Sequence, residues 1–197
     1  MDLLCLGDSL TFGSGVSPRE RWTALAAQLS GWHVINRGVC GDTAGGMLAR
    51  LQGELASGPD AVLIMGGLND IFFSGSDLSA RADMGAMLHQ VLASGAVPIA
   101  GIPTPLVPGM FPETWSAAVD FDAARAALGS YSEWLVRFCG AFGLCCVDFR
   151  PDFFDGAGNA DAALYIDGLH PGPEGHRRMA ARLAGVLKKL EGELGCG

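Results

Sequence analysis

Short apolar segments alternate with longer segments of helical spacing five times along the chain, and this alternation constrains the fold most. The segment 61–65, AVLIM, has no polar residue, which is typical of a strand covered on both faces of a parallel sheet. Repeated strand–helix units favour a parallel sheet between two helical layers, with right-handed crossovers. The sequence therefore predicts an α/β fold, a three-layer αβα sandwich whose five-stranded parallel sheet has the order 2-1-3-4-5. The strands are expected at 3–6, 32–36, 61–65, 96–102 and 144–148.

The spacing of apolar residues and several helix-ending glycines place helices after these strands. Gly129 is a candidate break within the fourth helix. Residues 71–73 are predicted to lie in a loop, and the proline-rich segment 103–115 and the segment 149–172 are predicted to be irregular. No linker or repeat interrupts the pattern, so residues 1–197 are expected to form one domain. The helices are expected at 21–30, 43–57, 78–94, 117–142 and 173–190.

Charge and composition exclude several classes of function. A net charge of −8 argues against nucleic acid or an anionic membrane surface as the main partner. No apolar run approaches the roughly 20 residues of a membrane span, and no basic segment of a secretory signal precedes the first strand, so a cytoplasmic protein without a membrane anchor is expected. The six cysteines form no C-x-x-C pair, so no metal site is predicted.

Gly7, Asp8 and Ser9 directly follow the first apolar segment. A buried strand that stops at such residues turns at the carboxyl edge of the sheet, where open α/β proteins bind ligands. Ser9 is well placed there to be a nucleophile. Asp8 and Ser9 are also preferred residues for capping the helix that follows. This segment alone leaves both interpretations open.

Other loops expected at the same edge carry the groups that a serine nucleophile requires. Ester hydrolysis through serine needs a base for the hydroxyl proton, an acid that holds the base, and donors for the developing oxyanion. Asp167 and His170 are three residues apart before the last helix and suit the roles of acid and base. Gly41 offers a backbone N–H near a helix start, Asn69 offers a side-chain N–H, and the N–H of Ser9 is a third donor.

Four sequence blocks in order make the chain resemble the GDSL, or SGNH, hydrolase family. They are GDSL at 7–10, GDT at 41–43, GLND at 67–70 and DGLHP at 167–171. GDT followed by LARL at 48–51 is most similar to the bacterial acyl thioesterase, lysophospholipase and arylesterase type. The resemblance implies a serine hydrolase without a cofactor, acting on a small-molecule ester or thioester through an acyl-enzyme. It implies the catalytic residues Ser9, Asp167 and His170, and the oxyanion hole Ser9, Gly41 and Asn69.

Two other functions remain as alternatives to an ester or thioester hydrolase with short- to medium-chain or lysophospholipid substrates. One is a carbohydrate O-deacetylase, and the other is a non-catalytic binding module with a flavodoxin-like layout. Thr11 stands where the second glycine of a G-x-S-x-G nucleophile elbow would be, so the ordinary α/β-hydrolase motif is missing. His176, one turn into the last helix among charged residues, is expected on its solvated side.

Loops at the predicted catalytic end contain unusually many large apolar residues. An acyl-binding groove and simple packing of the loops onto the body are equally good interpretations of this composition. The residues selected as substrate-binding candidates are Leu68, Ile71, Phe72, Leu106, Met110, Phe111, Tyr165 and Ile166. The same loops also carry Phe73, Val107, Trp115, Phe153 and Phe154.

Overall fold

A computed structural model describes residues 1–107, 109–116 and 119–194. One sheet of five parallel strands forms its centre, in the order β2-β1-β3-β4-β5. This order is the one that the sequence predicts. The strands are β1 (Asp2–Gly7), β2 (His33–Gly38), β3 (Ala61–Met65), β4 (Val97–Ile102) and β5 (Cys145–Asp148).

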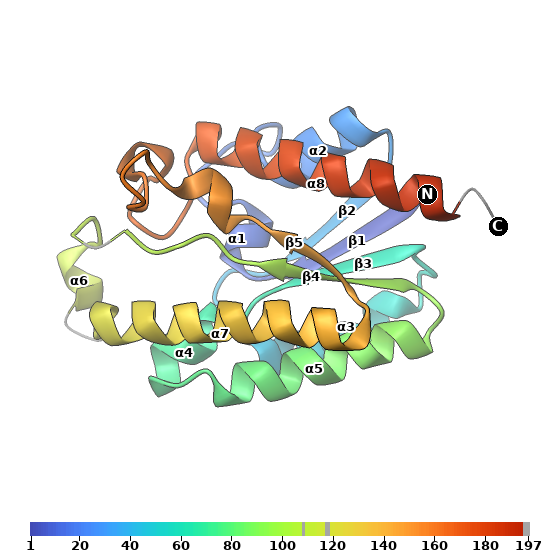
Figure 1. Cartoon of the computed structure of the whole chain (residues 1–197), viewed down its shortest axis with the longest axis horizontal. Helices are drawn as coiled ribbons and strands as arrows, with labels where there is room; N and C mark the ends of the chain where they lie inside the picture. The colour runs from blue at the N-terminus through green and yellow to red at the C-terminus, as the bar shows by residue number, and fades with distance from the viewer. Residues whose placement is uncertain (108, 117–118, 195–197) are drawn as a thin grey trace.

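Helices cover both faces of this sheet (Figure 1). Helices α2 (Trp22–Ser30) and α8 (Pro173–Leu194) pack together over one face. Helices α3 (Ala44–Leu55), α5 (Leu78–Ala93) and α7 (Phe121–Phe142) cover the other. The predicted three-layer αβα sandwich is therefore confirmed. Within the described ranges, no helix combines the length and apolarity that crossing a membrane requires.

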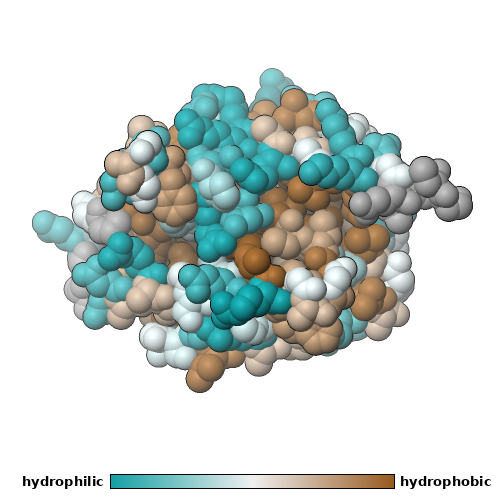
Figure 2. All heavy atoms as spheres, viewed as in Figure 1, coloured by the Kyte–Doolittle hydropathy of each residue, from teal (hydrophilic) through white to brown (hydrophobic). Residues whose placement is uncertain are grey.

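The middle strands are the most deeply buried part of the sheet. Every residue of β3, and residues 3–7 of β1, are buried. β5 is an edge strand of four residues, and Figure 2 shows hydrophobic residues gathered along this edge between the α7 and α8 layers. Because β1 and β3 are buried and closely packed, they form a rigid base for the loops that follow them.

Residues 68–74 form a helix, α4 (Leu68–Ser74), so the predicted loop at residues 71–73 is wrong. Leu68 and Ile71 are one helical turn apart, and both are almost fully buried, so packing favours the helix. Gly67 and Gly75 flank it with positive φ angles. A second short helix, α6 (Glu113–Ser116), begins within the predicted irregular segment 103–115, at the opposite end of the molecule from the N-terminus (Figure 1).

Helix α7 passes through Gly129 without a break. Gly129 lies on the exposed side, while Leu128, Ser132 and Leu135 are buried on either side of it. The buried face outweighs the roughly 1 kcal/mol that an exposed glycine costs a helix. The predicted start of this helix, at 117 and 118, lies outside the described residues, and Asp120 caps the observed helix by accepting from the N–H of Ala123.

His176 is fully buried, which corrects its predicted position on the solvated side of α8. Its Nδ1 accepts a hydrogen bond from the backbone N–H of Trp22, at 3.1 Å, where α2 begins. The first turn of α8 faces α2 rather than water, and the sequence of α8 alone does not show which helix it packs against. Burial lowers the pKa of His176 to about 4, so this side chain is neutral at neutral pH.

Candidate active site

A tight turn between β1 and α1 (Ser9–Phe12) places Ser9 at the carboxyl edge of the sheet. The Asp8 side chain caps α1 by accepting from the N–H of Leu10 at 2.9 Å, so Asp8 is the capping residue and the Ser9 hydroxyl is left for other contacts. Gly7 is needed because a Cβ there would lie 2.6 Å from the Met65 carbonyl oxygen. The turn therefore combines a close backbone approach with a capped helix start.

Asp167, His170 and Ser9 form a continuous chain of hydrogen bonds. His170 Nδ1 lies 2.7 Å from Asp167 Oδ2, and His170 Nε2 lies 2.9 Å from Ser9 Oγ. Asp167 Oδ1 also accepts from the backbone N–H groups of Leu169 and His170, at 3.1 and 2.8 Å. With the imidazole proton on Nδ1, Nε2 accepts the hydroxyl proton of Ser9. The sequence spacing of Asp167 and His170 thus produces the geometry of a serine, a base and an orienting acid.

The environment of Asp167 favours its ionised form. Burial opposes its ionisation, but the hydrogen bonds from the His170 ring and backbone and from Leu169 outweigh burial, so the pKa of Asp167 lies below its usual value. An ionised carboxylate beside Nδ1 stabilises an imidazolium when the ring takes up a proton. The pair is partly shielded, with 14% of the His170 side chain and 23% of the Asp167 side chain exposed. This arrangement can move a proton between Ser9 and a leaving group.

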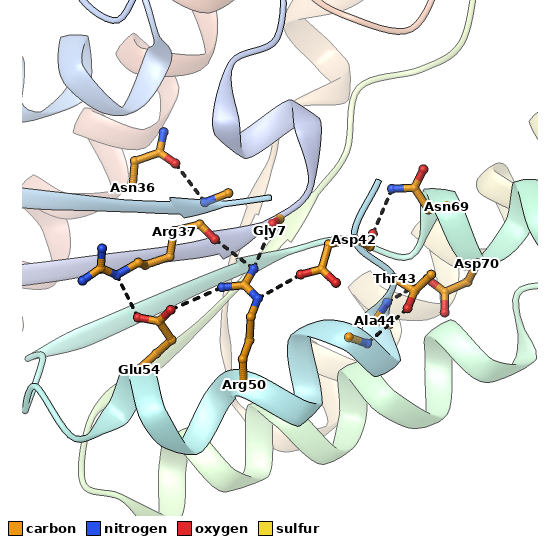
Figure 3. Close-up of polar contacts among 12 residues, drawn as sticks. Gly7, Asn36, Arg37, Asp42, Thr43, Ala44, Arg50, Glu54, Asn69 and Asp70 are labelled. Atoms are coloured by element: carbon orange, nitrogen blue, oxygen red, sulfur yellow. Dashed lines mark hydrogen bonds and ion pairs between the residues drawn. The ribbon is translucent and has the colours of Figure 1, made fainter. Parts of the chain in front are cut away.

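Gly41 and Asn69 lie beside Ser9 in the same cleft. Gly41 has a φ of +79°, a left-handed conformation that glycine adopts without strain. The Asn69 side chain comes from the first turn of α4, and its Nδ2 donates to the Asp42 carbonyl at 2.8 Å, as Figure 3 shows. An amide nitrogen carries two hydrogens, so this bond leaves a second N–H as a donor. The three groups expected to bind an oxyanion are therefore close together.

The cleft around Ser9 has a volume of about 480 Å³ and mostly apolar walls. Trp115 lies beside His170, with the two ring centres 6.1 Å apart in an edge-to-face arrangement. Phe121 forms part of the wall and is stacked on Phe111 behind it, with 3.7 Å between the ring centres. The lining residues are Ser9, Ser14, Cys40, Gly41, Asn69, Phe72, Phe73, Thr114, Trp115, Val119, Phe121, Leu169 and His170.

Of the eight substrate-binding candidates, the structure brings only Phe72 into the lining of this cleft. Leu68 and Ile71 are buried in the core under α4, because they occupy the inward face of that helix. Leu106 lines a separate cavity of about 470 Å³ bounded by α7 and the segments that follow β4 and β5. These three side chains therefore pack the loops onto the body, as the alternative interpretation expects.

The other four candidates do not line the cleft either. Met110 packs against the core, and Phe111 supports Phe121 from behind. Tyr165 is buried, and its hydroxyl donates to the Pro105 carbonyl at 2.6 Å. Ile166 is 47% exposed and lies against the Gly15 backbone.

Several residues that line the cleft are not among the substrate-binding candidates predicted from the sequence. Ser14 and Cys40 contact each other, with Oγ and Sγ 3.2 Å apart, although they are 26 positions apart. Val119 and Phe121 enter the cleft from the start of α7, and the only sequence signal for them is their place after the proline-rich segment. Trp115 and Phe73 belong to the apolar loop set described above, so composition did indicate them.

The chain belongs to the GDSL-like Lipase/Acylhydrolase family, whose profile matches residues 5–178. This confirms the resemblance seen in the four sequence blocks, and it makes the protein a carboxylic ester hydrolase acting on esters or thioesters. The family match favours a hydrolase over the alternative of a non-catalytic binding module, which would share the same strand order.

Individual relatives agree with this family. Esterase TesA of Pseudomonas aeruginosa is 27% identical over 195 residues, which cover 95% of this chain and 88% of TesA. The carbohydrate acetylesterase Est24 of Sinorhizobium meliloti has a TM-score of 0.79 at 25% identity, covering 96% of this chain and 99% of Est24. The aryl esterase of M. smegmatis has a TM-score of 0.81 at 23% identity, with 96% and 99% coverage, and so shares the fold.

Proposed function

We propose that Ser9 is the nucleophile of this hydrolase, that His170 is its base, and that Asp167 orients the base. Ser9 Oγ attacks the carbonyl carbon of the ester or thioester while its proton passes to His170 Nε2. The proton then moves to the leaving alcohol or thiol as the C–O or C–S bond breaks, which leaves an acyl group on Ser9. Water attacks this acyl-enzyme with His170 as the base, and the acid is released. The 2.9 Å contact between Nε2 and Oγ is the observation that carries this proposal.

The same proposal assigns the oxyanion hole to the N–H groups of Ser9 and Gly41 and to the amide of Asn69. In the tetrahedral intermediate the former carbonyl oxygen carries a negative charge, and donors fixed beforehand stabilise it without reorganisation. The Ser9 N–H lies at the start of α1, where the helix dipole favours negative charge, and Gly41 lies in the loop two residues before Thr43, the N-cap of α3. No cofactor takes part in this mechanism.

We also infer that the acyl chain lies along the aromatic wall formed by Phe72, Trp115 and Phe121. A volume of about 480 Å³ is in the usual range for sites that bind small molecules, and the wall is apolar. This favours short- to medium-chain acyl substrates. Each methylene buried against the wall contributes roughly 0.8 kcal/mol, so kcat/KM is expected to rise about 4-fold per methylene until the wall is covered.

A carbohydrate O-deacetylase is the second candidate function, because Est24, a carbohydrate acetylesterase, shares the fold at 25% identity. The two candidates differ in the acyl group that they favour. A series of nitrophenyl esters from acetate to octanoate separates them: kcat/KM that rises from acetate to butyrate and beyond supports the acyl groove. A maximum at acetate, together with turnover of acetylated sugars, supports the deacetylase.

Labelling with a fluorophosphonate tests the assignment of Ser9. The probe should label the wild type and not Ser9→Ala, and Ser9→Ala should lose several orders of magnitude in ester turnover. Ser14→Ala is a matched control in the same cleft, because the Ser14 hydroxyl contacts Cys40 rather than the base. Labelling should persist in Ser14→Ala. Near-normal ester turnover by Ser9→Ala would exclude Ser9 as the nucleophile.

A further inference from the structure

The guanidinium of Arg50, on α3, connects the carboxyl ends of β1 and β2 with the loop that follows β2 (Figure 3). Its Nη2 donates to the Arg37 carbonyl at 2.9 Å and to the Gly7 carbonyl at 3.2 Å, at the carboxyl ends of β2 and β1. Its Nε donates to Asp42 Oδ2 at 2.9 Å. One planar side chain therefore fixes the strand end before Ser9 relative to the loop that carries Gly41.

Asp42 links this guanidinium to the proposed oxyanion donors. Its backbone is bonded directly to Gly41, and its carbonyl accepts the hydrogen bond from Asn69 Nδ2. Its carboxylate fits against Gly46, where a Cβ would lie 2.0 Å from Oδ1, so the side chain of Asp42 has little room to move. Displacing Asp42 would therefore displace Gly41 and Asn69 together.

Arg50 also supplies positive charge beneath the site. Asp8, Asp42 and Asp70 lie close enough for the Asp42 charge to raise the pKa of both Asp8 and Asp70. Only 25% of the Arg50 side chain and 12% of the Asp42 side chain are exposed, so water screens their interaction less than it screens a surface pair. Without this cation, the mostly buried Asp42 carboxylate would lose its ion pair beside the proposed oxyanion hole.

We propose that Arg50 is a positioning residue that holds the oxyanion hole in register through Asp42. This inference rests on the proposed roles of Gly41 and Asn69 and extends them to a side chain that does not line the cleft. Its effect is expected mainly in the transition state, because the substrate carbonyl carries less negative charge than the intermediate. The binding of unreacted substrate should change little.

The test compares Arg50→Gln and Arg50→Lys with the wild type, using the full chain and a nitrophenyl ester. A misplacement of about 1 Å in a catalytic group can cost about 100-fold, so kcat of Arg50→Gln is expected to fall by roughly 10- to 100-fold with KM nearly unchanged. Arg50→Lys should fall less, because lysine restores the charge without the planar set of donors. The affinity for a trifluoromethyl ketone, which forms a tetrahedral adduct, should fall in parallel with kcat/KM.

Controls separate positioning from loss of structure. Active-site titration with a fluorophosphonate counts the folded sites, and every rate is expressed per titrated site. Arg137→Gln is the matched control, since the exposed Arg137 side chain pairs with Glu133 on α7, outside the contacts of Arg50, and should leave kcat unchanged. A kcat per site equal to wild type in Arg50→Gln overturns the inference, as does a change confined to KM. If Arg50→Gln does not fold, the same criteria apply to Arg50→Lys, for which a wild-type kcat overturns the inference.

Failure of this inference differs from failure of the proposed function. Unlabelled wild type, or an active Ser9→Ala, contradicts the assignment of the nucleophile whatever Arg50 does. A labelled, active wild type with an equally active Arg50→Gln leaves the nucleophile in place and contradicts only the role of Arg50.

Discussion

Asp8 gives a quantitative test of the electrostatics beneath the site. Its side chain is 1% exposed and accepts a hydrogen bond from the N–H of Leu10. Burial, together with the charges of Asp42 and Asp70, raises its pKa to about 7 against the opposing effect of the Leu10 bond. The substitution Asp8→Asn keeps an oxygen acceptor for Leu10 and removes the ionisable group. It should therefore change stability in a way that depends on pH.

The sign follows from proton binding. In the unfolded chain Asp8 has a pKa near 4, so between about pH 4 and pH 7 the folded state binds more protons. Ionising Asp8 therefore lowers the free energy of unfolding as pH rises through this window, and the loss is complete by pH 8. A pKa that rises from about 4 to about 7 on folding corresponds to roughly 4 kcal/mol. Asp8→Asn is expected to be more stable than wild type by up to this amount at pH 8, with almost no difference at pH 4.

Urea denaturation at pH 4.5, 6 and 8 measures the difference in unfolding free energy. Asp155→Asn is the matched control, because Asp155 also accepts from the N–H two residues ahead but is exposed. The pKa of Asp155 is lowered by bonds from the N–H groups of Asn159 and Ala157, so Asp155→Asn should give no gain at pH 8. A gain for Asp8→Asn that is equal at pH 4.5 and pH 8, or absent at pH 8, would refute this account of Asp8.

Two other substitutions test the site and its support. Asn69→Ala removes one proposed oxyanion donor, so kcat should fall about 10²- to 10³-fold, or roughly 3 to 4 kcal/mol; steady-state kinetics with near-normal turnover would contradict that role. His176→Leu leaves the Trp22 N–H without its acceptor, which should cost about 1 to 3 kcal/mol of stability at pH 7.5 by urea denaturation. Because the pKa of His176 falls from 6.5 to about 4 on folding, wild-type stability declines as pH drops from 6.5 to 4, and His176→Leu should show a smaller decline. An equal decline in both proteins would contradict the burial argument.

The sheet could be predicted because its signals are local. Residues 61–65 are apolar without interruption, and strand β3 has those same bounds. The contact between Asp167 and His170 could also be predicted from one segment, because the Asp167 carboxylate reaches both the backbone and the ring of His170, three positions ahead. Predicting such features requires only the residues of one segment.

Features that depend on packing between distant segments could not be predicted in this way. His176 lies among charged neighbours in the sequence, yet it faces α2, which is 154 positions away at Trp22. Leu68 and Leu106 are equally apolar in loops at the catalytic end, but one is buried under α4 and the other lines a separate cavity. Composition indicates that apolar residues gather at this end, and only the tertiary contacts decide which of them face Ser9.

His170, in the loop before α8, and His176, in the first turn of α8, have different roles in the structure. His170 contacts a carboxylate and Ser9, whereas His176 is buried and uncharged at neutral pH and accepts the first N–H of α2. His176 also donates its backbone N–H to the carbonyl of Gly172, two residues after His170, so the loop that carries His170 is anchored to α2. The anchoring bond requires a neutral ring, because a protonated His176 cannot accept from Trp22. Acid below about pH 4 should therefore loosen the support of His170 together with the packing of α8 on α2.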